Sequence, residues 1–374
     1  MVGYQETLTD PSYCGQIVCM TYPLIGNVGV NDIDNESAGV KMRGFIVSEL
    51  CDVPSNWQMK KTLDQYLDEQ GVTGLYGVDT RALTKHVRVY GTLRGRIVEG
   101  EATEADLELA KSFEMHDQVA QCTCKEAYKV PGEGKYHIAV MDFGLKRGIL
   151  RSLHDRGCSL TVFPADTPAS EILASGCDGV MLTNGPGDPQ DNPKAIAAIR
   201  ELMERAAQHA NREIYDLACA DPSKRGMGTT MVAMVLKNGL AHIVHAGDSR
   251  AYLYRHGRLE RLTRDHSMVQ EMVENGSLTP EEAEVHPNKN LITRAVGVNP
   301  DLAVEYGERQ ALPGDILLLC SDGLTNFTSE EELCGILESS EFFGAADAMI
   351  DAALAAGGQD NITAVLIKVE ATED

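Results

Sequence analysis

Three aspartates in the second half of the chain stand beside apolar runs, where carboxylates could bind a metal ion. Asp322 directly follows the run in "LLLCSDGLTN" (317–326), and Asp360 shortly precedes the run in "GGQDNITAVLIKV" (357–369). Asp248 follows a third run in "HAGDSRAYL" (245–253). Hard divalent cations take several oxygen ligands, and carboxylates at neighbouring strand ends can supply them. The alternative is that these aspartates only cap turns. The residues alone leave both interpretations open.

A glycine-rich loop in the first half could bring backbone N–H groups to a ligand. The loop "NGPGDP" (184–189) contains Gly185 and Gly187 and follows an apolar run. Glycine allows the backbone to approach a ligand closely and to turn its N–H groups inward. In parallel sheets, ligands bind beyond the carboxyl ends of the strands. The alternative is a tight turn in which glycine only supplies a positive φ.

The runs around these residues predict two different kinds of sheet. Residues 136–166 read as strand, helix and strand, and 178–183 add another strand, so we expect a parallel sheet with crossovers. Residues 125–135 are polar with Gly and Pro, as linkers are. Residues 228–263 are β-rich runs broken by "KNG" and "RHG", which predicts a meander of hairpins.

The stretch 201–218 lies between these two patterns and reads as one uninterrupted helix. It contains no Gly or Pro. Apolar residues recur in it at helical spacing: Leu202, Ala206, Ala210, Ile214 and Leu217. The change from crossovers to hairpins across this helix predicts a new domain.

Composition limits the classes of partner and compartment. A chain of 374 residues predicts two or three domains, and a net charge of −23 argues against a nucleic-acid or anionic-membrane partner. No apolar run is long enough to span a bilayer, and the N-terminus has no signal-peptide pattern. The ten cysteines include a CxC at Cys122 and Cys124 but no zinc spacing. We therefore expect reduced thiols in a cytoplasmic protein.

Five collinear motifs in residues 2–205 resemble the small, glutamine-hydrolysing subunit of carbamoyl-phosphate synthetase. They are "GYQETLTDPSYCGQIVCMTYPLIGN", "CDVPSNW", "GVDTRALTKHVR", "VMDFGLKRGILRSL" and "LTNGPGDPQDNP". The resemblance implies an N-terminal domain that contacts the large subunit, followed by a class I glutamine amidotransferase domain. It further implies that Ser12, Gly185 and Gly187 hold glutamine, with backbone donors near the oxyanion at Gly187 or its neighbour. The family's product, carbamoyl phosphate, serves pyrimidine and arginine pathways.

The groups that would hydrolyse glutamine are missing from the sequence. Such chemistry needs a thiolate at a strand-to-helix turn, a histidine base and an orienting carboxylate. In the family the cysteine lies in a G-x-C-x-G elbow after a strand that should begin near residue 207, but neither that motif nor H-x-E occurs in the chain. "GCDG" (176–179) precedes a strand instead of following one. We therefore assign no catalytic residue, and we expect the family's first strands to be missing as well.

A second set of motifs, in residues 207–369, resembles a bacterial metal-dependent Ser/Thr phosphatase of the PPM class. These are "GMGTTMVAMVL", "HAGDSRAYLY", "LTRDHSMVQEMVENGSLTPEEAEVHPNKNLITRAVG", "GDILLLCSDGLTN" and "GGQDNITAVLI". The resemblance implies two antiparallel sheets between helices and a phosphoprotein substrate. It makes Asp322 and Asp360 ligands of Mn²⁺ or Mg²⁺, places Asp248 and Ser249 in an outer shell, and makes 266–297 a flap.

The phosphatase resemblance is also incomplete. The family's substrate-binding Arg and its metal-bridging aspartates lie in R-x-x-N-E-D and D-G-M-G-G motifs, and neither motif occurs here. Two of the four core carboxylates are therefore missing, so we expect weak metal binding at most.

The sequence thus predicts a multidomain protein of α/β and α+β class. We expect a small-subunit N-terminal domain (1–124), a partial amidotransferase parallel sheet (136–205) and a partial PPM-type antiparallel β-sandwich with helices (206–374). The join is predicted near 204–208, inside the helix. The favoured hypothesis is a fusion inactive in both reactions. The alternatives are a metal-dependent phosphatase completed by another chain and a non-catalytic partner of the synthetase large subunit.

Overall fold

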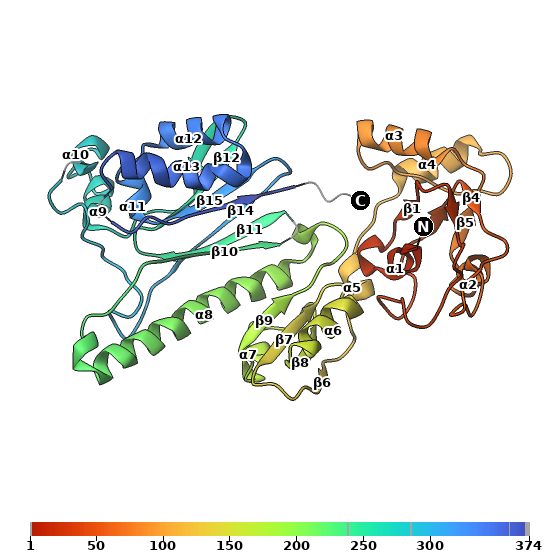
Figure 1. The fold of residues 1–374 in the computed structure, drawn as a ribbon, viewed down its shortest axis with the longest axis horizontal. Coiled ribbons are helices and arrows are strands. Elements are labelled where there is room, and N and C mark those ends of the chain that lie inside the picture. The colour runs from red at the N-terminus through yellow and green to blue at the C-terminus, as the bar shows by residue number, and fades with distance from the viewer. Residues whose placement is uncertain (1, 238, 285, 359, 371–374) are drawn as a thin grey trace. The chain divides into compact units, whose positions relative to one another are not determined.

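The chain divides into two compact units, which are described separately. A computed structural model describes residues 2–237, 239–284, 286–358 and 360–370 (Figure 1). Unit 1 covers Met1–Ala198 and unit 2 covers Ile199–Asp374. Among the described residues, no helix combines the length and apolar character needed to cross a membrane. The predicted three-part division, with bounds at 124, 136 and 205, stays a prediction.

Unit 1 begins with short parallel sheets packed around one apolar core. The sheet β1-β3-β5 and the pair β2-β4 are both parallel. Tyr4, Leu8, Ile25, Phe45 and Leu63 are almost completely buried at their centre. The elements up to residue 122 are α1 (Tyr4–Thr9), η1 (Pro11–Tyr13), β1 (Ile17–Cys19), β2 (Leu24–Ile25), β3 (Gly44–Ile46), β4 (Glu49–Leu50), α2 (Leu63–Glu69), β5 (Thr73–Leu75), α3 (Thr80–Tyr90), α4 (Glu104–Ser112) and α5 (Gln118–Cys122).

The second sheet of unit 1 contains the predicted parallel strands. Its order is β6-β8-β7-β9, with β7 parallel to both β8 and β9. The crossover pattern is therefore confirmed. Its elements are β6 (Tyr128–Val130), β7 (His137–Asp142), α6 (Arg147–Asp155), β8 (Ser159–Pro164), α7 (Ala169–Ala174), β9 (Gly179–Leu182) and η2 (Pro189–Asp191). The linker prediction for 125–135 is wrong in part, because "YKV" pairs antiparallel with β8 and forms an edge strand.

One long helix, α8 (Pro193–Ala220), continues without a break through the predicted join (Figure 1). Proline suits the first helical position because its missing N–H has no helical partner there. The buried stripe includes Leu202, Ala207 and Ala218, whereas Ala206 and Leu217 are exposed. The helix prediction is confirmed, but the apolar face is rotated slightly from the predicted one.

Unit 2 is an antiparallel β-sandwich with helices on its outer faces. One sheet has the order β10-β11-β14 and the other β13-β12-β15-β16. Ala207 and Ile214 of α8 pack on the first sheet with Val244, while Leu333 and Met349 pack on the second with Tyr252. The predicted fold class is thereby confirmed. The elements are η3 (Pro222–Lys224), β10 (Met231–Lys237), β11 (Leu240–Ala246), β12 (Arg250–Arg255), β13 (Arg258–Arg261), α9 (Met268–Glu274), α10 (Pro280–Glu284), β14 (Glu305–Gln310), β15 (Ile316–Cys320), α11 (Asp322–Thr325), α12 (Glu330–Ser339), α13 (Phe342–Ala355) and β16 (Ala364–Lys368).

The predicted meander is wrong at its centre. β10 pairs with β11, and β12 pairs with β13, but β11 and β12 belong to different sheets. The "RHG" hairpin is confirmed: His256 and Gly257 both have positive φ, 51° and 74°, as a type I′ turn requires. The "KNG" turn includes residue 238, which lies outside the described residues.

Candidate functional site

The glycine loop lies where the sequence predicts it, directly after the parallel strand β9. The buried Thr183 hydroxyl accepts a hydrogen bond from the Phe143 N–H (2.9 Å) and donates one to the Asn184 carbonyl (3.0 Å). A methyl group on Gly185 would lie 2.5 Å from the Phe143 carbonyl oxygen, closer than any side chain can. Gly185 is therefore needed for the loop to approach the end of β7.

Ser12 belongs to a turn that packs beside this loop. A methyl group on Gly144 would lie 3.2 Å from Cβ of Pro11 and 3.3 Å from Cα of Gly185. The Ser12 N–H donates a hydrogen bond to Asp10 Oδ1 (2.9 Å), and Asp10 Oδ2 also forms an ion pair with Lys146 Nζ (3.1 Å). The structure thus brings the turn containing Ser12 and the loop containing Gly185 to the same end of the sheet.

Gly187 has a positive φ of 79°, and its Cα faces the amide of Gln118. A methyl group on Gly187 would lie 2.8 Å from Gln118 Oε1, so helix α5 closes one side of the loop. The conformation is compatible both with a ligand-binding backbone and with a simple turn. The ligand role of Ser12, Gly185 and Gly187 stays a prediction.

Asp142 fixes the end of β7 against the rest of this site. Its carboxylate accepts hydrogen bonds from three backbone N–H groups, those of Cys124 (2.7 Å), Gly144 (3.0 Å) and Leu145 (2.7 Å). The side chain is only 6 % exposed. Because a buried carboxylate needs such partners, Asp142 is a positioning residue and not a free acid.

The predicted metal ligands lie in two neighbouring segments: Asp322 is the first residue of the short helix α11, and Asp360 lies in the loop before β16. The Ser321 hydroxyl donates to the Asn361 carbonyl (3.1 Å) and accepts from the Thr363 N–H (3.0 Å). A methyl group on Gly323 would lie 2.4 Å from the Asn361 carbonyl oxygen. Strand pairing of β15 with β16 thus brings two carboxylates together that are far apart in the sequence.

Asp248 belongs to the same end of the sandwich. Burial, together with the negative charge of Asp322, raises the pKa of Asp248 to about 6. A bound cation would relieve this repulsion between Asp248 and Asp322. The ligand role of Asp322 and Asp360 stays a prediction, as does the outer-shell role of Asp248. Ser249 is buried and shares a hydrogen bond with Thr230 (2.8 Å).

An ion-paired cluster is centred on Asp265, the residue directly before the predicted flap (266–297). Arg250 donates to both oxygens of Asp265 (2.7 Å for Nη2 to Oδ2), and Arg261 pairs with the same carboxylate. Asp265 is 8 % exposed. The flap segment begins at the next residue: Thr293 N–H donates to the His266 carbonyl (2.7 Å), so the two ends of 266–293 are joined.

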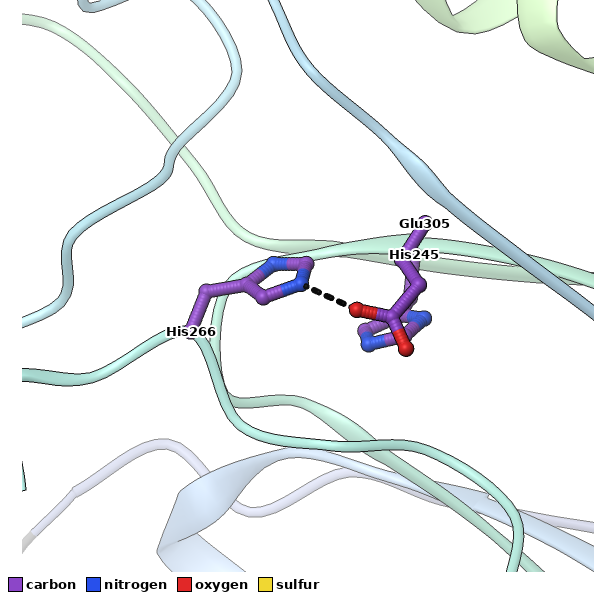
Figure 2. A group of neighbouring side chains, drawn as sticks. All are labelled: His245, His266 and Glu305. Atoms are coloured by element: carbon purple, nitrogen blue, oxygen red, sulfur yellow. Dashed lines mark hydrogen bonds and ion pairs between the residues drawn. The ribbon is translucent and has the colours of Figure 1, made fainter. Parts of the chain in front are cut away.

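Sequence reasoning missed a cluster of His245, His266 and Glu305 at the base of this segment (Figure 2). The two histidines are buried, and their rings are stacked with centroids 4.7 Å apart. One ligand atom from each residue lies within 4.8 Å of the others. The sequence signal was weak: His245 lies near the end of β11, and His266 lies in the loop after β13. Glu305 comes from β14, where it pairs with His245 in the sheet.

Hydrogen bonds argue that this cluster is structural and not a metal site. The Gly247 N–H donates to His266 Nδ1 (3.2 Å), so neutral His266 carries its proton on Nε2, which faces Glu305 Oε2 at 3.2 Å (Figure 2). His245 Nε2 donates to the Arg264 carbonyl (2.8 Å). A metal on His266 Nε2 would have to displace that proton. Burial lowers the pKa of His266, which favours this neutral form.

Comparisons with known proteins match both halves of the chain. The family "Carbamoyl-phosphate synthase small chain, CPSase domain" matches residues 1–97, "Glutamine amidotransferase class-I" matches 139–208, and "Protein phosphatase 2C" matches 180–272. The last two matches overlap in the glycine loop and the first part of α8. Both resemblances expected from the sequence are confirmed, and segments of both kinds are present in one chain.

The chain is also similar to individual known proteins. The carbamoyl phosphate synthase small chain of Bacillus caldolyticus is 48 % identical over 224 residues, 59 % of this chain and 61 % of that protein. The small chain of Bacillus thuringiensis subsp. konkukian is 39 % identical over 345 residues, 89 % of this chain and 90 % of that protein. A serine/threonine phosphatase structure from S. agalactiae is 38 % identical and covers 46 % of this chain and 71 % of its own, with a TM-score of 0.45.

Proposed function

Because the chain belongs to the carbamoyl phosphate synthase small-chain family, we propose that it is a fusion with a phosphatase 2C segment that catalyses neither family's reaction. One observation carries this proposal. After the glycine loop, the chain passes through α8 into the antiparallel sheet of β10, and no G-x-C-x-G or H-x-E motif occurs in it. The chain therefore has no cysteine elbow that would supply the thiolate for attack on glutamine.

Glutamine binding without hydrolysis is the remaining role we propose for the first half. Ser12, Gly185 and Gly187 would hold the ligand with backbone and hydroxyl groups. The packing of Gly144 between Pro11 and Gly185 supports this, because it brings both elements to one sheet end. Without a thiolate, bound glutamine would leave unchanged.

Ammonia release from glutamine tests the missing reaction. We expect none above background from the pure protein, because a covalent thioester needs a cysteine at the elbow. Steady release that iodoacetamide abolishes would contradict the proposal.

Glutamine binding is tested separately by calorimetric titration of Gly187→Ala and Gly176→Ala. Both glycines have positive φ, 79° and 68°, but only Gly187 lies in the loop, and a methyl group on Gly176 would meet nothing within 4 Å. We expect Gly187→Ala alone to weaken binding. Equal affinity of both variants for glutamine would show that the glycine loop is not part of the glutamine site.

For the second half, we propose weak binding of Mn²⁺ or Mg²⁺ by Asp322 and Asp360. A bound pair of such ions supplies an activated water for attack on phosphate. The hydrogen bonds between the two loops support the pairing of these carboxylates. With only these two of the four expected core carboxylates, affinity should be low and a phosphoprotein would not be hydrolysed.

The test adds millimolar Mn²⁺ and an aryl phosphate to the protein, to Asp322→Asn and to Asp347→Asn. Asp347 is exposed on α13 and is the matched control. We expect no turnover by any of them, and a metal-binding signal that only Asp322→Asn loses. Turnover by the protein and by Asp347→Asn, but not by Asp322→Asn, would establish a working phosphatase centre.

A second candidate function is docking to a synthetase large subunit in the cytoplasm. Trp57 and Val53 are 90 % and 84 % exposed in the "CDVPSNW" segment, an unusual position for large apolar side chains. We expect co-elution with a carbamoyl phosphate synthase large subunit that Trp57→Ala weakens and the exposed Leu354→Ala on α13 does not. Failure of the unchanged protein to co-elute would exclude this function.

A further inference from the structure

Two cysteines that are far apart in the sequence meet in unit 1. Cys14 follows η1, and Cys122 ends helix α5. The two thiols lie close enough that each shifts the pKa of the other. Each thiol also faces the other's element: Cys14 Sγ lies 3.9 Å from Gln121 Oε1, and Cys122 Sγ lies 3.6 Å from the Pro11 carbonyl oxygen. That carbonyl also accepts the Cys14 N–H (3.0 Å), so one oxygen ties both cysteines together.

The surroundings of Cys14 favour a thiolate. Its neighbours include Lys41 and Arg43, whose segment is held beside it because Gly15 N–H donates to the Lys41 carbonyl (3.0 Å). The Cys122 thiol, helped by these two cations, outweighs burial and lowers the pKa of Cys14 to about 7. A thiolate is the nucleophilic form of cysteine, and reactive cysteines lie in such electropositive surroundings.

Cys124 is the other member of the CxC motif, yet its environment has the opposite effect. Burial and the carboxylate of Asp142 raise the pKa of Cys124 to about 11. Its backbone N–H is also used, as a donor to Asp142 (2.7 Å). Two cysteines separated by one residue therefore differ in partner, and only Cys122 faces another thiol.

We propose that Cys14 and Cys122 form a redox-sensitive dithiol, a modification site that hydrogen peroxide converts to an intramolecular disulfide. The Cys14 thiolate attacks one peroxide oxygen, which breaks the O–O bond and gives a sulfenic acid and hydroxide. The Cys122 sulfur then displaces the sulfenic oxygen, which leaves as water when it takes up the Cys122 proton. The proton released when Cys14 ionised neutralises the hydroxide. One peroxide thus oxidises two thiols and yields two waters.

The size of the oxidant follows from burial. Cys14 is only 2 % exposed, while Cys122 is half-buried. A small, uncharged peroxide can reach such a pair, whereas a bulky aromatic disulfide reagent should react slowly with it.

The sequence dictates how the disulfide is best detected. Trypsin leaves Cys14 together with Cys19 in residues 1–41, and Cys122 together with Cys124 in residues 112–125. Two full-length proteins are therefore compared, both with Cys19→Ser. One also has Cys124→Ser and keeps Cys122, and the other has Cys122→Ser and keeps Cys124. They differ in which of two thiols, separated by one residue, remains.

After equimolar peroxide and thiol blocking, non-reducing peptide mapping should find residues 1–41 linked to 112–125 in the first protein and not in the second. The link should be lost when peroxide is added in 8 M urea, because the unfolded chain no longer holds Cys14 beside Cys122 and cysteines then pair at random. Equal linkage in both proteins, or no linkage in the first while other cysteines are oxidised, would overturn the proposal. Mapping the unaltered protein, with fragmentation to assign the sulfurs, keeps the result independent of variant folding.

Discussion

The glycine loop of unit 1 and the carboxylates of unit 2 are positioned in opposite ways. The loop is held by groups near in sequence to the parallel strands, above all by the Asp142 carboxylate and the Thr183 hydroxyl. The segments that carry Asp322 and Asp360 depend instead on the pairing of β15 with β16 and on the hydrogen bonds of Ser321. Each half keeps the support of a site, but the groups that react are missing. The residues that position each site can therefore be tested by substitution separately in each unit.

The largest effect is expected in unit 2 for Asp265→Ala. This change removes the buried Asp265 carboxylate and leaves the partly buried Arg250 guanidinium without that partner, so the free energy of unfolding should fall by about 3–5 kcal/mol. Urea unfolding followed by circular dichroism measures it. The matched control is Glu260→Ala, which removes an exposed pair with Arg309 and should cost about 1 kcal/mol or less. Similar losses for both would contradict the distinction.

The corresponding change in unit 1, Asp142→Ala, should cost somewhat less, about 2–4 kcal/mol. It leaves three backbone N–H groups without their acceptor near the glycine loop. Hydrogen exchange should accelerate at the amides of Cys124, Gly144 and Leu145, while unit 2 amides keep their protection. Asp155→Ala, at an exposed pair with His154, is the control. Loss of protection across both units would mean that the two supports are not independent.

Acid should weaken unit 2 through His266. Its pKa is lowered in the folded state, so the unfolded chain takes up a proton there first as the pH falls below about 6.5. Stability is therefore present above that pH and is lost below it, by up to about 1.4 kcal/mol per pH unit. Burial is the main cause, and His245 and the positive charge of Arg294 also lower the pKa of His266, whereas the Glu305 carboxylate raises it and offsets part of the shift.

Urea midpoints between pH 7.5 and 5 measure this loss. His266→Gln should flatten the pH dependence, whereas His209→Gln, at an exposed position of α8, should leave it unchanged. An unchanged slope in His266→Gln would assign the acid sensitivity to another group.

The smallest effects concern two glycines of unit 2 and should have opposite signs. Gly257 has a φ of 74° in the type I′ turn, so Gly257→Ala should destabilise by about 1 kcal/mol. Gly344 lies in α13, and a methyl group there meets nothing within 4 Å, so Gly344→Ala should stabilise by up to about 1 kcal/mol. Thermal unfolding of both variants decides this, and equal signs would contradict the turn assignment.

The sequence predicted what depends on short-range patterns. The strands around 137–142 and 159–164, the long helix and the "RHG" turn are all local signals, and all are confirmed. It failed where tertiary pairing decides. The stretch between "KNG" and "RHG" reads as one β-rich run, but it contains two strands, β11 and β12, and the three residues between them carry the chain from one sheet to the other.

The candidate sites show the same limit. Asp322 and Asp360 could be chosen because each stands beside an apolar run. The pairing of Cys14 with Cys122, and of His266 with Glu305, had no such signal, because the partners come from distant elements. Such pairs become visible only when the packing is known.

The sheet order of unit 2 also bears on its synthesis at the ribosome. Every residue of β11 is buried in the finished fold, and Ile243 pairs with Gly307 of β14. About 60 residues lie between β11 and β14, and at roughly 5–20 residues per second the ribosome takes about 3–12 s to make them. During that time β11 can pair with β10 only, and its other edge is open to wrong partners. Slower translation of the segment 247–304 should therefore lower the soluble yield, and a holding chaperone should restore it.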